Sequence, residues 1–423
     1  MSVLPWGLLP DNSGESWDGS LTIGGCSVPE LAAEHGTPLF IYDEEHLRKR
    51  CREAVAAFGD RAVYAGKAFL CLAMARLVHE EGLGIDVASG GELFVALAAG
   101  VPGERLVVHG NNKSMDELRS AAAARVGRLV IDSFDEFDRI EALHRETGHV
   151  FDALVRVTPG VEAHTHHYVA TGQDDSKFGF TLSSGLAARA VAAARGNPGV
   201  RLRGVHVHIG SQVFQVNSFA AALGAMAAFV RTHQLPELSM GGGLGVAYIE
   251  GEHAPSISEY GTILETAARD ATLRSELWVE PGRAIVAGAA ITVYTVGTIK
   301  ELAGIRTYVA VDGGMSDNPR PVLYGSGYET FLPRAVRADR TESVRVVGKH
   351  CESGDILVRE GRVPDDLRVG DLLATPVTGA YGHSMGSNYN KVPRPAVLFV
   401  KDGNARVVIE RESYDDLLRH DRL

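Results

Sequence analysis

From residue 45 to residue 282, short β-branched runs alternate with longer amphipathic stretches. Eight of these runs are typical of strands, at 62–66, 84–88, 105–109, 128–132, 152–157, 202–208, 237–240 and 277–280. Helical patterns lie between them, for example at 45–58, 114–125, 136–147, 184–195 and 219–233. Such alternation favours a parallel sheet covered by helices, and eight strands predict an α/β fold built on a (β/α)8 TIM-like barrel. A doubly wound open sheet is the alternative that this pattern leaves open.

After residue 282 the pattern changes to short strands with few helices between them. These strands are expected at 289–298, 307–311, 343–347, 355–358, 371–375 and 396–400. They predict a mainly antiparallel β domain, which a strand at 21–28 could also join. We therefore expect a barrel domain over 36–282 and a discontinuous β domain over 1–35 and 283–423.

The charge balance narrows the class of partner. With 42 basic and 53 acidic residues the net charge is −11, which argues against binding to nucleic acid or to an anionic membrane surface. No apolar run reaches the ~18 residues of a membrane helix, and the N-terminal segment lacks the pattern of a signal peptide. The four cysteines are not spaced as metal ligands, so no metal site is expected. A cytoplasmic enzyme that acts on a small molecule is the resulting expectation.

In a barrel of this class the active site lies at the carboxyl ends of the strands. The chemically active residues at these ends are Lys67, Asp86, His109, Arg156, His208, Gly241–Gly243 and Glu280. Lys67 ends an apolar strand, where two interpretations are open. It is either a surface lysine with a buried stem or a partly desolvated amine that can condense with an aldehyde.

Three consecutive glycines, Gly241–Gly243, follow a strand and can present backbone N–H groups to a phosphate, although tight turns also use glycine. The run lacks the Lys and Ser/Thr of a P-loop, so a single phosphate is the better match. Glu280 and Arg283 end the last strand, either as an ion pair that closes the barrel or as ligands. Together with Lys67 and the glycines, they suggest a cofactor with an aldehyde, a basic ring nitrogen and a phosphate.

Several motifs in a fixed order carry a family resemblance. In the barrel they are YAGKAF (64–69), DVASGGEL (86–93), HGNNKS (109–114), GVEAHTH (160–166), HVHIGSQ (206–212), the triple glycine and EPGR (280–283). In the β domain they are DGGMSDN (312–318), GKHCESGD (348–355) and GAY (379–381). On these motifs the chain resembles the fold-type III pyridoxal 5'-phosphate (PLP) decarboxylases, which have an alanine racemase-like fold. Within them it is most similar to the diaminopimelate decarboxylases of the actinobacterial type.

The resemblance implies a role for each matched residue. Lys67 would hold PLP covalently and His208 would stack on the cofactor ring. The phosphate would be bound by Ser211, Gly241, Gly242, Gly243 and Tyr381. The remaining cofactor contacts would come from Asp86, Arg156, Glu280, Gly282 and Arg283, with Glu92 supporting the lysine end of the pocket. His206 has the strand parity of His208 but lies deeper in the barrel, so we assign it to structure.

Glu280 indicates the reaction class. A carboxylate beside the pyridine nitrogen keeps that nitrogen protonated, and the resulting electron sink suits the loss of CO2. The alanine racemases resemble this chain less and place an arginine at that point, which weakens the sink. Decarboxylation is therefore favoured over racemisation.

The resemblance also implies a shared active site. A lone cysteine is more often a small buried hydrophobe, but Cys351 would here donate the proton that replaces CO2. It would act with Glu352 across the interface of a homodimer. For the substrate, Arg283 and Arg320 can bind carboxylates bidentately, Glu352 can bind an ammonium group, and Tyr324 and Tyr381 can add hydroxyl groups.

The predicted function is PLP-dependent decarboxylation of meso-2,6-diaminopimelate to L-lysine and CO2, the last step of lysine biosynthesis by that route. The catalytic set is Lys67, His208, Glu280 and Cys351. Two alternatives remain. One is a related PLP decarboxylase that acts on ornithine, D-lysine or a conjugated amino acid in a secondary pathway. The other is a non-enzymatic relative that keeps the fold as a binding protein.

Overall fold

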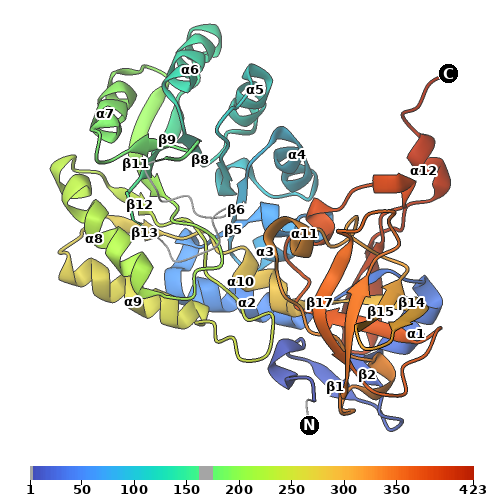
Figure 1. Cartoon of the computed structure of the whole chain (residues 1–423). Coiled ribbons are helices and arrows are strands. Elements are labelled where there is room, and N and C mark those ends of the chain that lie inside the picture. Colours follow the sequence, from blue (N-terminus) through green and yellow to red (C-terminus); the bar gives the residue numbers. More distant parts are fainter. Residues whose placement is uncertain (1–2, 162–174) are drawn as a thin grey trace. The chain divides into compact units, whose positions relative to one another are not determined.

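The computed structural model describes residues 3–161 and 175–423. The chain divides into two compact units (Figure 1). The barrel unit comprises Arg50–Gly245 and Ala254–Ala284, and the β unit comprises Met1–Lys49, Val246–His253 and Ile285–Leu423. In the described parts of the chain, the helices are all too short or too polar to span a membrane.

Eight parallel strands form the barrel unit. In pairing order they are β5 (Val63–Ala65), β6 (Gly84–Val87), β7 (Leu106–Val108), β8 (Arg128–Ile131), β9 (Phe151–Thr158), β11 (Val200–Val207), β12 (Glu237–Ser239) and β13 (Glu276–Trp278). A short strand, β10 (Phe180–Thr181), adds to β9. The ring closes where the Val63 N–H donates to the Val279 carbonyl at 2.9 Å, beside a parallel bridge between Ala62 and Val279. The closure confirms the predicted barrel over the open sheet.

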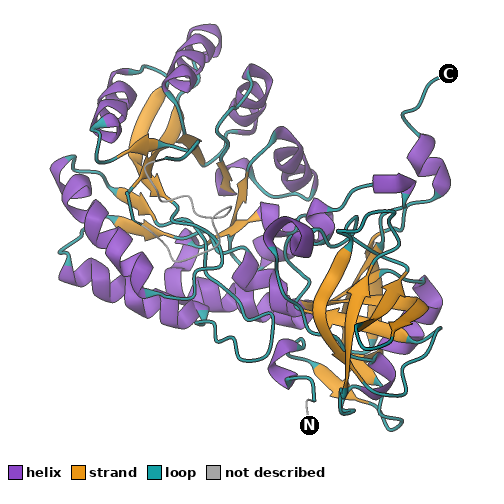
Figure 2. Ribbon diagram, in the orientation of Figure 1, coloured by secondary structure: helices purple, strands orange, loops and turns teal. Residues whose placement is uncertain are grey.

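Helices follow the barrel strands in sequence and lie outside them (Figure 2). They are α3 (Leu72–Glu80), α4 (Gly90–Ala98), α5 (Met115–Ala124), α6 (Phe134–Thr147), α7 (Leu186–Gly196), α8 (Asn217–Thr232) and α9 (Ile257–Asp270). A further helix, α2 (Glu44–Phe58), precedes β5. Local sequence sets several of their starts. Ser114 and Glu117 form a reciprocal capping box at α5, and Ser256 with Glu259 does the same at α9.

The strand register arranges the barrel interior in layers. Residues two apart on a strand share a face. A buried apolar layer is formed by Val63, Val107, Val130, Leu154 and Trp278. Two residues further along four of these strands lie His109, Asp132, Arg156 and Glu280. The charged side chains therefore gather at the carboxyl ends of the strands, above an apolar floor.

The β unit is built on one large sheet. Its strands, in pairing order, are β17 (Ile356–Val363), β16 (Glu342–Val347), β15 (Arg306–Val311), β14 (Ala290–Leu302), β4 (Leu39–Asp43), β19 (Ala396–Lys401) and β20 (Asn404–Ile409), with β18 (Leu372–Pro376) also on β14. The β15–β16 and β4–β19 pairs are parallel and the others are antiparallel. The predicted mainly antiparallel domain is confirmed. Short helices α10 (Arg283–Val286), α11 (Arg320–Tyr324) and α12 (Tyr414–Leu418) complete the order.

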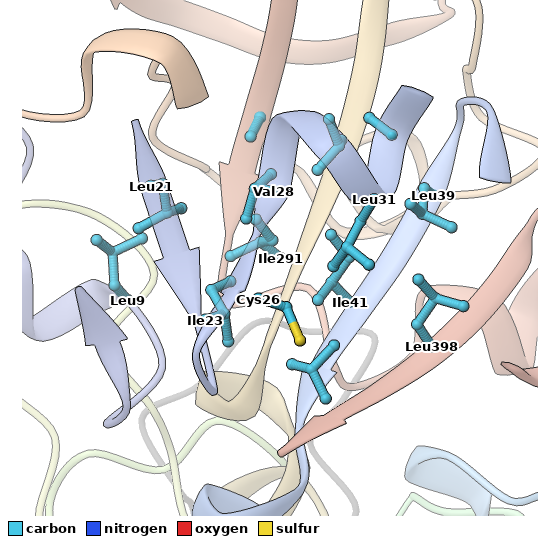
Figure 3. Packing of buried hydrophobic residues seen from close by; sticks show 14 of the residues in the cluster. Leu9, Leu21, Ile23, Cys26, Val28, Leu31, Leu39, Ile41, Ile291 and Leu398 are labelled. Carbon is cyan, nitrogen blue, oxygen red and sulfur yellow. The ribbon is translucent and has the colours of Figure 1, made fainter. Parts of the chain in front are cut away.

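The segment at 21–28 lies in the β unit but outside this large sheet. It forms β2 (Leu21–Ile23) and β3 (Cys26–Ser27), which pair with β1 (Ser13–Glu15) in a separate three-stranded sheet. Its apolar side chains and those of α1 (Val28–His35) pack against the large sheet, as Figure 3 shows for Ile23 and Leu31 beside Ile291. The segment therefore contributes to the core of the β unit by packing and not by strand pairing.

The sequence predicts that the barrel domain begins at residue 36, whereas the strand that follows this residue lies in the β unit. Leu39–Asp43 is buried throughout and pairs on both sides, with β14 and with β19. A strand followed directly by a helix has the local pattern of a barrel unit, and only its pairing partners place it in the other sheet. The compact barrel unit accordingly begins at Arg50.

Candidate active site

Glu280 lies just beyond β13 with its carboxylate buried in the barrel interior. Its Oε2 lies 2.9 Å from Nε2 of His206, and its Oε1 accepts a hydrogen bond from the Ser239 hydroxyl at 3.0 Å. His109 Nε2 lies 3.5 Å from Oε1. Two imidazoles and a hydroxyl therefore surround one carboxylate.

The charges in this cluster follow from burial and neighbours. Burial lowers the pKa of His206 to about 4, although Glu280 opposes the shift, so the ring is neutral and its Nε2–H donates to the carboxylate. Burial also disfavours protonation of His109, but Asp86 and Glu280 outweigh it and raise the pKa of that ring. For Glu280, burial alone would raise the pKa, yet His206 and His109 hold it well below its ordinary value. Glu280 is thus anionic.

Lys67 lies at the carboxyl end of β5, in the single 3-10 turn Gly66–Ala68. Its side chain is exposed, and its charge lowers the pKa of both Asp86 and His208. Burial raises the pKa of Asp86, and the nearby His109 and Lys67 only partly offset this. The amine therefore lies within electrostatic reach of the buried cluster, at the end of the barrel where a reacting aldehyde would be bound.

Arg156 extends from the carboxyl end of β9. Its Nε lies 3.8 Å from Oδ1 of Asp132, and its guanidinium lies over the Phe178 ring at 4.4 Å. Burial lowers the pKa of Arg156, but a guanidinium stays charged in proteins. Its positive charge acts on Asp86 and Glu280. Arg156 is therefore a fixed cation at the side of the cluster.

His208 links the cluster to the glycine run. Its Nδ1 accepts a hydrogen bond from the Gly242 N–H at 3.2 Å. Burial, and then the charge of Lys67, lower the pKa of His208 well below its ordinary value. The ring is therefore neutral with its proton on Nε2, which suits a side chain that packs against an aromatic ring.

The glycine run takes a path that only glycine fits. A Cβ at Gly242 would lie 2.3 Å from the Glu280 carbonyl oxygen, and one at Gly243 would lie 2.2 Å from the Gly210 carbonyl oxygen. Gly241 and Gly243 also have positive φ values, +63° and +117°. Glycine here lets the backbone of this loop approach both neighbouring strand ends.

A hydroxyl and a guanidinium follow the two strands on either side of β12, the strand that ends in the glycine run. Ser211 follows β11, and Arg283 follows β13. Arg283 Nη2 donates to the Ser211 hydroxyl at 2.8 Å, and Arg283 is itself buried. Gly282 is closely packed, since a Cβ there would lie 2.9 Å from the Ala65 Cβ. Both groups are of the kind that binds phosphate oxygens.

These residues fit PLP. Lys67 supplies an accessible primary amine for the aldehyde, and Glu280 supplies a buried anion for the ring nitrogen. Ser211 and Arg283, which are hydrogen-bonded to each other, supply a hydroxyl and a guanidinium for the phosphate beside the close-packed Gly241–Gly243 loop. The donor set therefore matches all three polar parts of the cofactor.

The β unit holds the other predicted substrate residues. Arg320 is buried, donates from Nη1 to the Tyr328 hydroxyl at 2.5 Å, and lies 4.0 Å from the centroid of the Tyr248 ring. Its Nε has no hydrogen-bond partner among the described residues. Tyr324 and Tyr381 are half-buried, and Tyr381 has φ +58°. Tyr248 and Tyr328 were not predicted, because a tyrosine in a loop carries no local signal of a guanidinium beside it.

Cys351 and Glu352 lie in one exposed turn of the β unit. The Tyr389 hydroxyl donates to Glu352 Oε1 at 2.5 Å. Asp355 anchors the base of the turn by accepting from the His350 N–H at 2.9 Å. The alternative that Cys351 is a small buried hydrophobe is therefore wrong, and its thiol is accessible.

Two side chains of the barrel cluster were underestimated from the sequence. The sequence assigns His206 to structure and marks His109 only as a strand end, yet both lie against Glu280. Their strand positions gave the signal, because both end a strand on its inward face. Of the motif at 160–166, residues 162–166 lie outside the described residues.

Comparison with known proteins defines the class. Residues 44–287 match the family model described as pyridoxal-dependent decarboxylase, pyridoxal binding domain. This match spans more than half of the chain and agrees with the donor set at the barrel ends. The chain belongs to the pyridoxal-dependent decarboxylases, and its cofactor is PLP.

Relatives that match nearly the whole chain define the family within this class. Diaminopimelate decarboxylase of Mycobacterium tuberculosis (strain ATCC 25618 / H37Rv) is 47% identical, over 97% of this chain and 96% of the relative. That of Bacillus subtilis (strain 168) is 45% identical, over 98% of each chain. The solved structure of diaminopimelate decarboxylase from M. jannaschii in complex with L-lysine superposes with a TM-score of 0.89, at 31% identity and 98% coverage of each chain. Within its class, this chain is a member of the diaminopimelate decarboxylase family.

Proposed function

We propose that this chain removes CO2 from the D-configured centre of meso-2,6-diaminopimelate and so forms L-lysine. The observation that carries the proposal is the buried Glu280 carboxylate, held anionic between His206 and His109 in the barrel that also carries Lys67. When bound, PLP supplies an electron sink for the electron pair left by CO2. The residues of the chain bind it, orient it and control the protons around it.

Glu280 keeps a proton on the ring nitrogen, because a buried anion favours the cationic form of its partner. His206 fixes the orientation of this carboxylate through its Nε2–H, and Ser239 holds the other oxygen. Asp86 and Arg156 contribute further charge beside the ring. Lys67 would hold the cofactor covalently, because its amine can condense with the aldehyde.

Gly241–Gly243, Ser211, Arg283 and Tyr381 would hold the phosphate, and His208 would pack against the cofactor ring. The support for this assignment is the tight glycine path and the Arg283–Ser211 hydrogen bond. Gly282 keeps the strand end close to its neighbour. Glu92 holds the turn after β6, since its Oε2 accepts from the Ala88 N–H at 2.6 Å.

The distal end of the substrate carries both a carboxylate and an ammonium group. Arg283 and Arg320 bind carboxylate oxygens, and Tyr324 and Tyr381 add hydroxyl contacts. Arg320 Nε is a buried donor, which supports this role. Glu352 binds the ammonium group, and the accessible thiol of Cys351 donates the proton that replaces CO2.

The active protein is a cytoplasmic homodimer whose two active sites are shared across the interface. In this arrangement Cys351 and Glu352 serve the cofactor of the other subunit. The exposed turn that carries both residues supports this part of the proposal.

The test is CO2 release and lysine formation by the purified chain with PLP and meso-diaminopimelate, with L-ornithine and D-lysine in parallel. Rapid lysine formation with little turnover of the other two substrates is the expected result. Bound PLP with preferential turnover of ornithine or D-lysine would instead establish the related decarboxylase. Failure to turn over any of them with PLP bound would leave a binding protein.

A further inference from the structure

A fully buried lysine lies beside the active end of the barrel. Lys113 follows β7 and is 3% exposed. Its Nζ donates to the carbonyl oxygens of Gly110 and Val130 and to Glu136 Oε1, each at 2.7 Å. These three acceptors use all three protons of the ammonium group. Lys113 therefore joins the loop after β7 to the end of β8.

Glu136 completes a bridge from this lysine to the next strand end. It lies in the first turn of α6 and is 1% exposed. While Oε1 accepts from Lys113, Oε2 accepts from the Asp132 N–H at 3.0 Å. The pair thus fixes the backbone of the residue that directly follows β8. Because desolvation offsets much of the attraction in a buried ion pair, stability alone is a weak reason for it.

Asp132 in turn contacts the active-site cation. Its Oδ1 accepts from the Gly179 N–H at 2.9 Å and lies 3.8 Å from Arg156 Nε. The Arg156 guanidinium also lies 4.4 Å from the centroid of the Phe178 ring. A continuous line of contacts therefore runs from Lys113 through Glu136 and Asp132 to Arg156.

We propose that Lys113 and Glu136 are positioning residues for Arg156, and that they act by fixing Asp132. This inference rests on the proposed role of Arg156 beside the cofactor ring. Neither Lys113 nor Glu136 needs to touch cofactor or substrate. Their contribution is the location of a positive charge that acts on Glu280 and Asp86.

The barrel contains a matched control at its opposite end. Arg128, at the start of β8, donates from Nη2 and Nε to Glu237, at the start of β12, at 2.6 and 2.9 Å. Glu237 is also 1% exposed. This ion pair lies on the amino side of the apolar layer, where barrel residues contribute to stability and not to the site.

The experiment compares E136Q with E237Q in the holoenzyme. A glutamine at 136 can still accept from Lys113, but its amide group cannot also accept from the Asp132 N–H. We expect E136Q to raise the dissociation constant of PLP about tenfold, the size of effect that outer-shell partners have at bound metals. We expect E237Q to leave that constant within twofold while both variants lower Tm. Equal effects on PLP binding would show that burial alone matters and overturn the proposal.

A double-mutant cycle tests the route through Arg156. In an R156Q background, E136Q should change neither the PLP dissociation constant nor the absorption spectrum of the bound cofactor any further. If the two effects multiply, Glu136 does not act through Arg156. Should E136Q fail to fold, the double variant K113M/E136L replaces the pair with apolar side chains and again frees the Asp132 N–H, so the same rise is expected.

Measuring PLP affinity in the absence of substrate separates this inference from the proposed function. A wild-type chain that binds PLP but does not convert diaminopimelate would contradict only the substrate assignment. An unchanged PLP dissociation constant in both E136Q and K113M/E136L would contradict only the positioning role.

Discussion

His206 donates its Nε2–H to Glu280 Oε2 at 2.9 Å, and both side chains are buried. A neutral imidazole in this place orients the carboxylate without neutralising it. The second imidazole, that of His109, lies 3.5 Å from the other carboxylate oxygen of Glu280. This pair is the part of the site on which the proposed chemistry most depends.

Replacing Glu280 by glutamine keeps the shape of the side chain and removes its charge. We expect kcat for diaminopimelate to fall on the order of 10²-fold, the usual scale for losing one preorganised electrostatic group, while PLP stays bound. Steady-state kinetics with cofactor quantification measure both. Glu276→Gln, at the exposed start of the same strand, is the control. A kcat within twofold of wild type in Glu280→Gln would contradict the role.

Lys67→Ala should abolish turnover together with the absorbance of the lysine-bound cofactor, because the amine that binds the aldehyde is gone. Absorption spectra and lysine formation are measured on the same sample. Lys49→Ala removes an exposed lysine that pairs with Asp11 and should change neither readout. Normal decarboxylation by Lys67→Ala would overturn the cofactor attachment.

Cys351→Ala should retain PLP but lower kcat on the order of 10²-fold, the size of a typical general-acid contribution. Ser353→Ala changes an exposed residue of the same turn and should keep normal turnover. Rate measurements at saturating substrate distinguish the two variants. An unchanged kcat in Cys351→Ala would remove this thiol from the acid role.

Alanine substitutions at two glycines, one in the glycine run and one in a helix, should have opposite effects on stability. Gly243→Ala forces a Cβ against the Gly210 carbonyl at a φ of +117°, so it should cost about 1–3 kcal/mol of stability and weaken PLP binding. Gly224→Ala, inside α8 with open space around it, should stabilise by about 0.5–1 kcal/mol. Denaturant unfolding gives both values. Equal stability of the two variants would refute this account of the loop.

The buried His206 predicts a pH dependence of stability. Its pKa falls from 6.5 to about 4 on folding because burial disfavours the charged ring, so the unfolded chain binds more protons between these values. The free energy of unfolding should therefore decrease as pH falls through this window, by at most about 1.4 kcal/mol per pH unit from this group. His206→Gln should lessen that slope while keeping a donor to Glu280. Identical slopes in the two proteins, from unfolding at pH 5 and pH 7, would contradict the prediction.

Much of the fold could be predicted because its signals are local. Strand and helix periods, the Ser114 capping box and the triple glycine each depend on neighbours within a few residues. The β4 strand shows the limit of such signals. Its sequence is that of any buried strand, and its pairing with β14 and β19, more than 240 residues away, determines its unit.

The strand–helix alternation and the family motifs can be seen in the sequence alone, and so can the positions of Lys67, Glu280 and Cys351 along the chain. The tertiary structure closes the ring from Val279 onto Val63 and brings His109 and His206 to one carboxylate. It also decided their charges, and it decided that Lys113 is linked to Arg156 through Glu136 and Asp132. The physical reason is that desolvation and Coulomb interactions depend on distances between strands, which local sequence patterns do not contain.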